Sequence, residues 1–141
     1  MQTFLPYPSF TDSMRVLDNS RLGNQVYREG MTLLRGKWPN HPASKMWQGY
    51  EDALAAYLWA GVLELDIRGK GYWHRPWCLE LQGHLAGVQG SIPTMPPWLN
   101  DGNFHASHRS NLLRKDPVWY GQFGWTEPDN LEYVWPSMEE Q

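Results

Sequence analysis

Proline and glycine separate this chain into three segments with helical periodicity. The chain has 11 prolines and 13 glycines among its 141 residues, and both residue types end helices. No segment shows the alternation expected of a β-strand. The expected helices span about residues 11–36, 42–68 and 104–116. We expect a break in the first of them near Asn19 or Gly23.

Three other segments connect or extend these helices. Residues 1–11 contain two prolines, which keep the preceding residues out of the helical conformation, so this segment is expected to be extended. Residues 91–102 contain three prolines and are typical of a connection, whereas residues 77–87 fit a short helix. We therefore predict a mainly α protein: one compact domain over residues 1–141, a bundle of about three main helices with long Pro- and Gly-rich connections.

Cysteine content and hydropathy favour a cytosolic protein with no membrane segment. Cys78 is the single cysteine, so no internal disulfide can form, and a reducing compartment is expected. Residues 1–10 carry no charge and are interrupted by proline, unlike a signal peptide. No apolar run is long enough for a membrane span.

Charge is distributed unevenly along the chain. The formal net charge is −3, but residues 126–141 form an acidic tail with five acids and no Lys or Arg. The rest of the chain therefore holds twelve cations against ten acids. Residues 15–37 alone contain five cations and two acids. This polarised pattern is compatible with an anionic partner that binds the body rather than the tail.

The helix expected at residues 104–116 combines histidines with cations. Asn103 or Asp101 can cap its start, and Pro117 ends it. Helical spacing brings several donors to neighbouring faces, which favours binding of phosphate or carboxylate oxygens. The donors are His105, His108, Arg109, Arg114 and Lys115. The alternative is a solvated basic face with no ligand.

Glu29 occupies an unusual position in the first expected helix. Helical spacing places it on the same stripe as the apolar Leu22, Val26 and Leu33. A carboxylate there must pair with a cation, take up a proton or line a cavity. Arg21, Gln25 and Arg28 follow on the adjoining face, where they could hold a phosphodiester next to the acid. The alternative is an ordinary amphipathic helix in which Glu29 bonds to a neighbouring arginine.

Four segments in order resemble the pyrimidine-dimer DNA glycosylases of the bacteriophage endonuclease V type. They are MQTFLPYPSF, VLDNSRLGNQVYREG, NHPASKMWQGYEDAL with the later RGKGY, and HASHRSNLLRKDPVWYGQFG. Each segment alone is weak, but together they span most of the chain in the order of the family.

The resemblance implies a compact helical enzyme that turns a base out of duplex DNA and cuts the glycosidic bond. In the family, an N-terminal amine attacks the sugar and a helix carboxylate supports the resulting iminium before strand cleavage. The tripeptide Tyr27, Arg28 and Glu29 resembles the catalytic helix, which makes Glu29 the acid and Arg28 a contact near the scissile nucleotide. Arg21 resembles a position at which the phage enzyme carries histidine.

The nucleophile is where this chain departs from the family. The family enzyme exposes a small second residue after removal of methionine, whereas Gln2 stands here and favours a retained Met1. The α-amine of Met1 has a reference pKa of about 8 and is partly neutral at physiological pH. A glycosylase that uses water activated by a carboxylate would need no such amine.

Other chemistries have weaker support. His105 and His108 could join Cys78, His74 or His84 around zinc, but no CxxC or HExxH motif is present, so we expect no metal and no cofactor. Tryptophans usually fill cores, yet one or two could stack on a flipped base. The candidates are Trp47, Trp98 and Trp119.

The sequence therefore predicts a monomeric DNA glycosylase, with AP-lyase activity as a second expected step, acting on damaged or modified pyrimidines in double-stranded DNA. The resemblance places it in a bacterial cytoplasm or a phage-infected cell. One alternative is a binding module of the same fold that has lost the chemistry and holds DNA or a nucleotide. Another is a phage accessory protein that binds a host factor.

Overall fold

The computed structural model describes residues 2–72, 75–87 and 93–136. In these ranges the chain forms helices and no strand, which confirms the mainly α prediction. The α-helices are α1 (Phe10–Val16), α2 (Asn19–Gly23), α3 (Met31–Leu34), α4 (Pro42–Trp47), α5 (Glu51–Ile67), α6 (Pro76–Ala86), α7 (Gly102–Lys115) and α8 (Pro117–Tyr120). A π-helical segment, η1 (Asn24–Gly30), joins α2 to α3, and two 3₁₀ segments are η2 (Pro97–Asn100) and η3 (Gly121–Phe123).

Local signals explain where these helices begin and end. The expected break near Asn19 is confirmed, because the carboxylate of Asp18 accepts from the backbone N–H of Arg21 and starts α2 there. Asp101, of the two candidate caps, accepts from Asn103 N at 2.9 Å and starts α7. The expected helix from Pro42 is in fact split into α4 and α5, because Gly49 has a φ of +85° that no right-handed helix contains.

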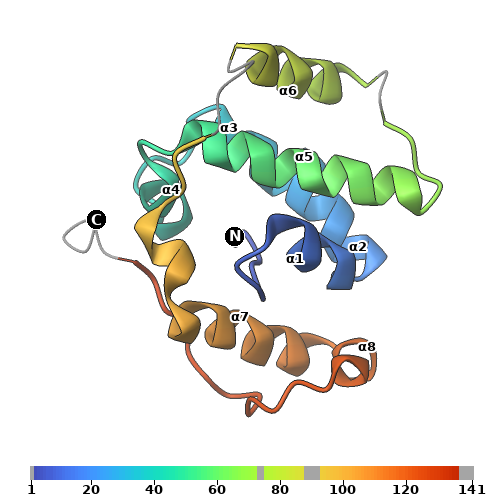
Figure 1. Cartoon of the computed structure of the whole chain (residues 1–141), viewed down its shortest axis with the longest axis vertical. Coiled ribbons are helices and arrows are strands. Elements are labelled where there is room, and N and C mark those ends of the chain that lie inside the picture. Colours follow the sequence, from blue (N-terminus) through green and yellow to red (C-terminus); the bar gives the residue numbers. More distant parts are fainter. Residues whose placement is uncertain (1, 73–74, 88–92, 137–141) are drawn as a thin grey trace.

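Helix α5 is the centre of one layer of the fold. It packs against α1, α2, η1, α3, α4 and α6, and Figure 1 shows α6 on one side of it and α1 and α2 on the other. Two glycines permit the closest approaches. A Cβ on Gly30 would lie 2.0 Å from Leu58 Cδ2, and one on Gly61 would lie 2.4 Å from Val26 Cγ2.

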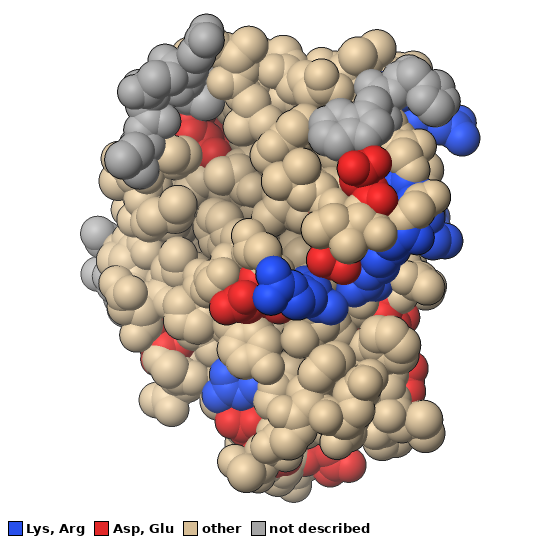
Figure 2. Space-filling model, turned by 45° about the vertical axis from the view of Figure 1, so that its right-hand side comes forward, with Lys and Arg blue, Asp and Glu red and all other residues tan. Residues whose placement is uncertain are grey.

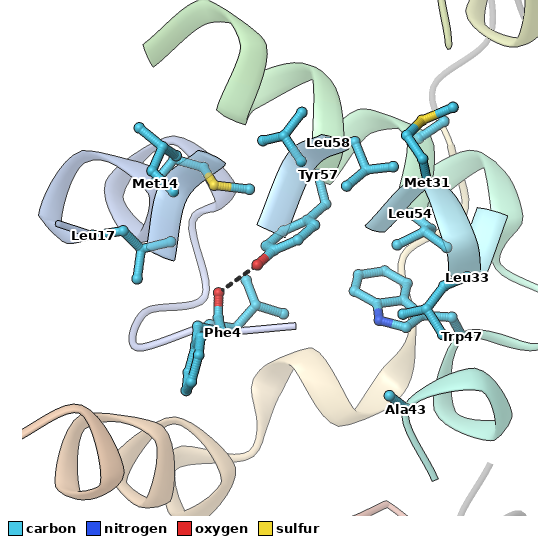
Figure 3. Close-up of a cluster of buried hydrophobic side chains, with 14 of the residues drawn as sticks. Phe4, Met14, Leu17, Met31, Leu33, Ala43, Trp47, Leu54, Tyr57 and Leu58 are labelled. Atoms are coloured by element: carbon cyan, nitrogen blue, oxygen red, sulfur yellow. Dashed lines mark hydrogen bonds between the residues drawn. The ribbon is translucent and has the colours of Figure 1, made fainter. Parts of the chain in front are cut away.

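Residues 2–6 run as buried extended chain between the α5 layer and α7. The hydroxyl of Tyr57 donates to the carbonyl of Phe4 at 2.7 Å, the contact drawn in Figure 3 within the apolar cluster. On the other side, Leu5 N donates to His108 Nδ1 at 2.8 Å, and Leu5 O lies 2.6 Å from His105 Nδ1. This segment therefore links α5 to α7.

The described part of the acidic tail packs onto α7. Leu131 N donates to Ser110 Oγ at 3.0 Å, and Val134 N donates to Ser107 Oγ at 3.1 Å. Glu127 pairs with Arg109 at 2.8 Å. Residues 126–136 are thus a structural part of the domain, rather than a mobile charged arm held away from it.

No helix among the described residues is both long and apolar enough to cross a lipid bilayer.

The close contact at Gly30 yields a stability prediction. Gly30→Ala inserts a methyl group against Leu58 and the carbonyl of Gln25, so we expect it to lower the free energy of unfolding by about 1–3 kcal/mol or more. Gly83→Ala is the control, because Gly83 is an exposed position within α6 with no atom near its Cβ. It should raise stability by about 0.5–1 kcal/mol. Urea denaturation measures both, and equal effects would contradict the packing at Gly30.

Candidate active site

Glu29 lies near the end of the π-helical segment, half-buried at the surface. The expected apolar stripe of Leu22, Val26 and Leu33 is buried, but Glu29 does not share it. The hydrogen bonds of a π-helix span one more residue than those of an α-helix. The side chains after Asn24 therefore point in directions that differ from those expected for an α-helix. Gly30 takes the buried place instead, and the carboxylate of Glu29 reaches the surface.

Gln25 holds Glu29 against the start of the chain. Its Nε2 donates to Glu29 Oε2 at 3.0 Å and to Gln2 O at 2.7 Å. Its Oε1 accepts from Phe4 N at 2.8 Å and from the Tyr57 hydroxyl at 3.0 Å. The amide is thereby fixed at both ends and is almost fully buried.

The main chain also contacts the carboxylate directly. Gln2 N lies 3.4 Å from Glu29 Oε2, a long hydrogen bond. Burial, together with the negative charge of Glu29, raises the pKa of Tyr57 well above its ordinary value. Tyr57 therefore remains a hydroxyl donor. Met1 lies outside the described residues.

Two pockets meet at Glu29. One has a volume of about 530 Å³ and carries two aromatic side chains; it is lined by Asn24, Tyr27, Arg28, Glu29, Thr32 and Trp38. The other has a volume of about 380 Å³ and carries two cations; it is lined by Gln2, Phe4, Ser20, Arg21, Asn24, Gln25, Glu29, Lys115 and Tyr133. We call them the aromatic pocket and the cationic pocket. Both volumes lie in the range of ligand sites.

The structure thus brings together five of the residues that the sequence singled out: Arg21, Gln25, Arg28, Glu29 and Lys115. Arg21 pairs with Asp18 at 3.1 Å and keeps 28% of its side chain exposed. Arg28 and Lys115 are exposed. Lysine and arginine form a band across the face shown in Figure 2, with acids next to several of them, so the charge of that face is mixed.

A comparison with protein families decides the class. The family model described as pyrimidine dimer DNA glycosylase matches residues 1–78. The chain belongs to this family. The match contains Glu29 and every residue of the aromatic pocket, and it ends before α7. Comparisons with curated proteins and with solved structures find no match. At the level of the family, the function is of the pyrimidine dimer DNA glycosylase type.

Three of the five donors expected on α7 are bonded to the main chain within the fold, which corrects the expected anion-binding surface. His105 and His108 are 2% and 0% exposed and contact the main chain of Leu5. Arg109 donates to Pro6 O at 2.7 Å and pairs with Glu127. The histidines were placed on a surface because spacing along one helix does not reveal the buried extended segment beside it.

Arg114 and Lys115 are the two expected α7 donors that remain exposed. Arg114 donates to Asn111 Oδ1 and lines neither pocket. Lys115, at the end of the helix, lines the cationic pocket.

The tryptophans proposed to stack on a base have structural roles in this fold. Their indole N–H groups are all bonded within the fold: Trp47 to Thr3 Oγ1 at 3.0 Å, Trp98 to Met46 O at 2.9 Å and Trp119 to Val16 O at 2.8 Å. The aromatic residues of the pocket are instead Tyr27 and Trp38. Trp38 was missed, although its place between Gly36 and Pro39, off any helical stripe, is a sequence signal of an exposed loop.

The residues considered for zinc do not form a metal-binding group in the part of the chain that the structure describes. Among the residues that the structure describes, no three His, Cys, Asp or Glu side chains form a group suited to a metal. His84 lies 3.3 Å from Asp52, and Cys78 is buried and accepts from Gln82. His74 lies outside the described residues.

The burial of His108 gives a pH prediction. Burial, with a smaller contribution from the charge of His105, lowers the pKa of His108 to about 3. The unfolded chain, with a histidine pKa of about 6.5, binds a proton that the folded chain does not, so this group removes stability as pH falls below about 6.5. Between about pH 7.5 and pH 5 the loss should reach about 2 kcal/mol.

The variant His108→Asn keeps an acceptor for Leu5 N and removes the titration. Its free energy of unfolding should therefore change less over this pH range than that of the wild type. Denaturant unfolding at each pH is the measurement, and an unchanged slope in His108→Asn would show that the pKa of His108 is the same in the folded and unfolded chains.

Proposed function

We propose that this chain excises damaged pyrimidines from double-stranded DNA, with Glu29 as the acting carboxylate. Family membership supports the reaction class. The observation that carries the choice of residue is that Glu29 lies at the border of the aromatic and cationic pockets. A base can occupy the first while a phosphate occupies the second, which leaves the sugar between them beside the carboxylate.

Cleavage of a glycosidic bond leaves positive charge on the sugar, and a fixed carboxylate stabilises that charge. Gln25 fixes the carboxylate of Glu29, because its own amide is bonded to the main chain of Gln2 and Phe4. The position of the negative charge is thus set before DNA binds. This arrangement lowers the reorganisation needed in the transition state.

Two nucleophiles are compatible with this geometry, and we favour the amine of Met1. Consecutive Cα atoms lie about 3.8 Å apart, and Gln2 N is 3.4 Å from Glu29 Oε2. The amine would attack the anomeric carbon as the base leaves, and loss of a proton from nitrogen with opening of the sugar ring would give an imine. Elimination of the 3′ phosphate from that imine is the AP-lyase step. The other nucleophile is a water molecule that Glu29 deprotonates.

Arg21 and Lys115 are the proposed phosphate contacts in the cationic pocket, and Arg28 is a third at the aromatic pocket. Arg21 is oriented by Asp18, whereas Lys115 is a flexible point charge. We propose that one copy of the chain suffices, because all these residues come from one chain.

Glu29→Gln keeps the volume and removes the charge. We expect the rate of glycosidic-bond cleavage in a duplex with one pyrimidine dimer to fall about 100-fold or more, while affinity for that duplex stays equal or rises because one negative charge is lost. Single-turnover kinetics and a binding titration measure the two quantities. Glu80→Gln is the control. Glu80 is an exposed residue of α6 that pairs with Arg35, so this variant should keep the wild-type rate and affinity.

Borohydride reduction during the reaction separates the nucleophiles, because only an imine is trapped covalently on DNA. Trapping that disappears when the α-amine is acetylated assigns the amine, and glycosidic-bond cleavage without trapping assigns water. A wild-type protein that binds the duplex and cleaves no glycosidic bond would be an inactive binding module. Absence of binding at low salt would leave the host-factor alternative.

Lys115→Ala tests the cationic pocket. Each phosphate contact contributes about 0.9 to the slope of log K against log salt, so the slope should become shallower by about that amount. Lys70→Ala, after the end of α5 and outside both pockets, should leave the slope unchanged. Equal slopes for Lys115→Ala and the wild type would remove Lys115 from the interface.

A further inference from the structure

Trp38 combines exposure, strain and a place in the aromatic pocket. Its side chain is 58% exposed, and within the part of the chain that the structure describes no other ring stacks on it. It is also the one non-glycine residue with a positive φ among the described residues, at +56°. A bulky residue in this conformation lowers stability.

The loop imposes this conformation. Pro39 disfavours the right-handed helical region for the residue before it. His41 N donates to Trp38 O at 3.1 Å and closes a turn with Pro39 at its second position. Lys37 N donates to Thr32 O at 3.2 Å, which ties the start of the loop to α3. The backbone therefore holds Trp38 in place without help from a packed core.

Tyr27, the other aromatic residue of this pocket, is held by packing. Its ring lies 6.2 Å from Tyr72 and 6.1 Å from Trp77, and a Cβ on Gly23 would lie 3.0 Å from it. It is 39% exposed. The pocket thus has one aromatic side chain held by packing and one carried by a backbone that the loop holds, and Glu29 lies in the same pocket.

We propose that Trp38 stacks on a single nucleobase turned out of the duplex into the aromatic pocket. This inference rests on the proposed function. A glycosylase must reach the anomeric carbon next to Glu29, and an extruded base needs an aromatic or apolar face to replace its lost stacking. Glycine would adopt a φ of +56° with less strain than tryptophan. The large exposed ring at this position is therefore not explained by a contribution to stability.

The pocket also offers polar groups for the edge of a base. Thr32 Oγ1 donates to Arg28 O at 2.6 Å, so its lone pairs remain available as acceptors. The Asn24 side chain lines both pockets and carries a donor and an acceptor. A planar base in this pocket can therefore form hydrogen bonds along its edge.

The test measures affinity in the Glu29→Gln background, so that DNA is bound but not cut. Trp38→Gly and Trp38→Ala should bind a dimer-containing duplex about 5- to 150-fold more weakly, which corresponds to roughly 1–3 kcal/mol of stacking. Trp38→Phe should restore most of the affinity. Ile67→Ala, at a 78% exposed position at the end of α5, is the control and should have no effect.

Two further duplexes identify the base. In one, an abasic analogue replaces the lesion; in the other, it replaces the nucleotide opposite an intact lesion. The effect of Trp38→Gly should vanish on one of them, and that duplex lacks the base on which Trp38 stacks. An equal loss of affinity on the dimer duplex and on both abasic duplexes would mean that Trp38 contacts the DNA backbone or inserts into the double helix. That result would overturn the proposal.

Stability gives an independent readout. Because the glycine relieves the strained φ, the Tm of Trp38→Gly should stay equal to or rise above that of its parent. A fall in Tm with unchanged affinity assigns Trp38 to packing and overturns the inference, while the proposed function stands if Glu29→Gln still prefers the dimer duplex. No preference of that protein for dimer over undamaged DNA would overturn both.

Discussion

Residues 2–6 form extended main chain in the interior, and no neighbouring strand is present in the described structure to pair with it. Buried peptide groups must nevertheless be hydrogen-bonded. Side chains supply the partners here: Gln25, Tyr57, His105, His108 and Arg109. Loss of one partner would leave a buried polar group unpaired, at a cost of about 1–3 kcal/mol. These buried polar side chains therefore contribute to the stability of the fold, as the buried leucines do.

The same segment connects the fold to the candidate site. Gln25 bonds both to the main chain of residues 2–4 and to Glu29, so the position of the carboxylate depends on the docking of that segment. On the opposite side, α7 holds Leu5 through His105 and His108. Helix α7 thus supports the site chiefly through the segment it binds, and contributes Lys115 to it directly.

The helical class and several boundaries could be predicted from the sequence, because Pro, Gly and capping residues act locally. The break before α2 and the cap at Asp101 are examples. Glu29 could be singled out by its spacing, but its half-exposed position depends on the π-helical segment, which 3.6-residue periodicity does not represent. His105 and His108 were expected on the surface, since their partner Leu5 is about a hundred residues away in sequence. Trp38 depends on a loop conformation rather than on any period.

The distance along the chain between the buried segment and its partners has a consequence for biosynthesis. Leu5 and Pro6 are synthesised about a hundred residues before His105, His108 and Arg109. Such long-range contacts close late in folding, because a large loop must be ordered first. A nascent chain that ends before α7 can form the α5 layer and still lack the anchor that holds its first residues beside Glu29. The geometry around Glu29 would then be completed only after α7 has been synthesised.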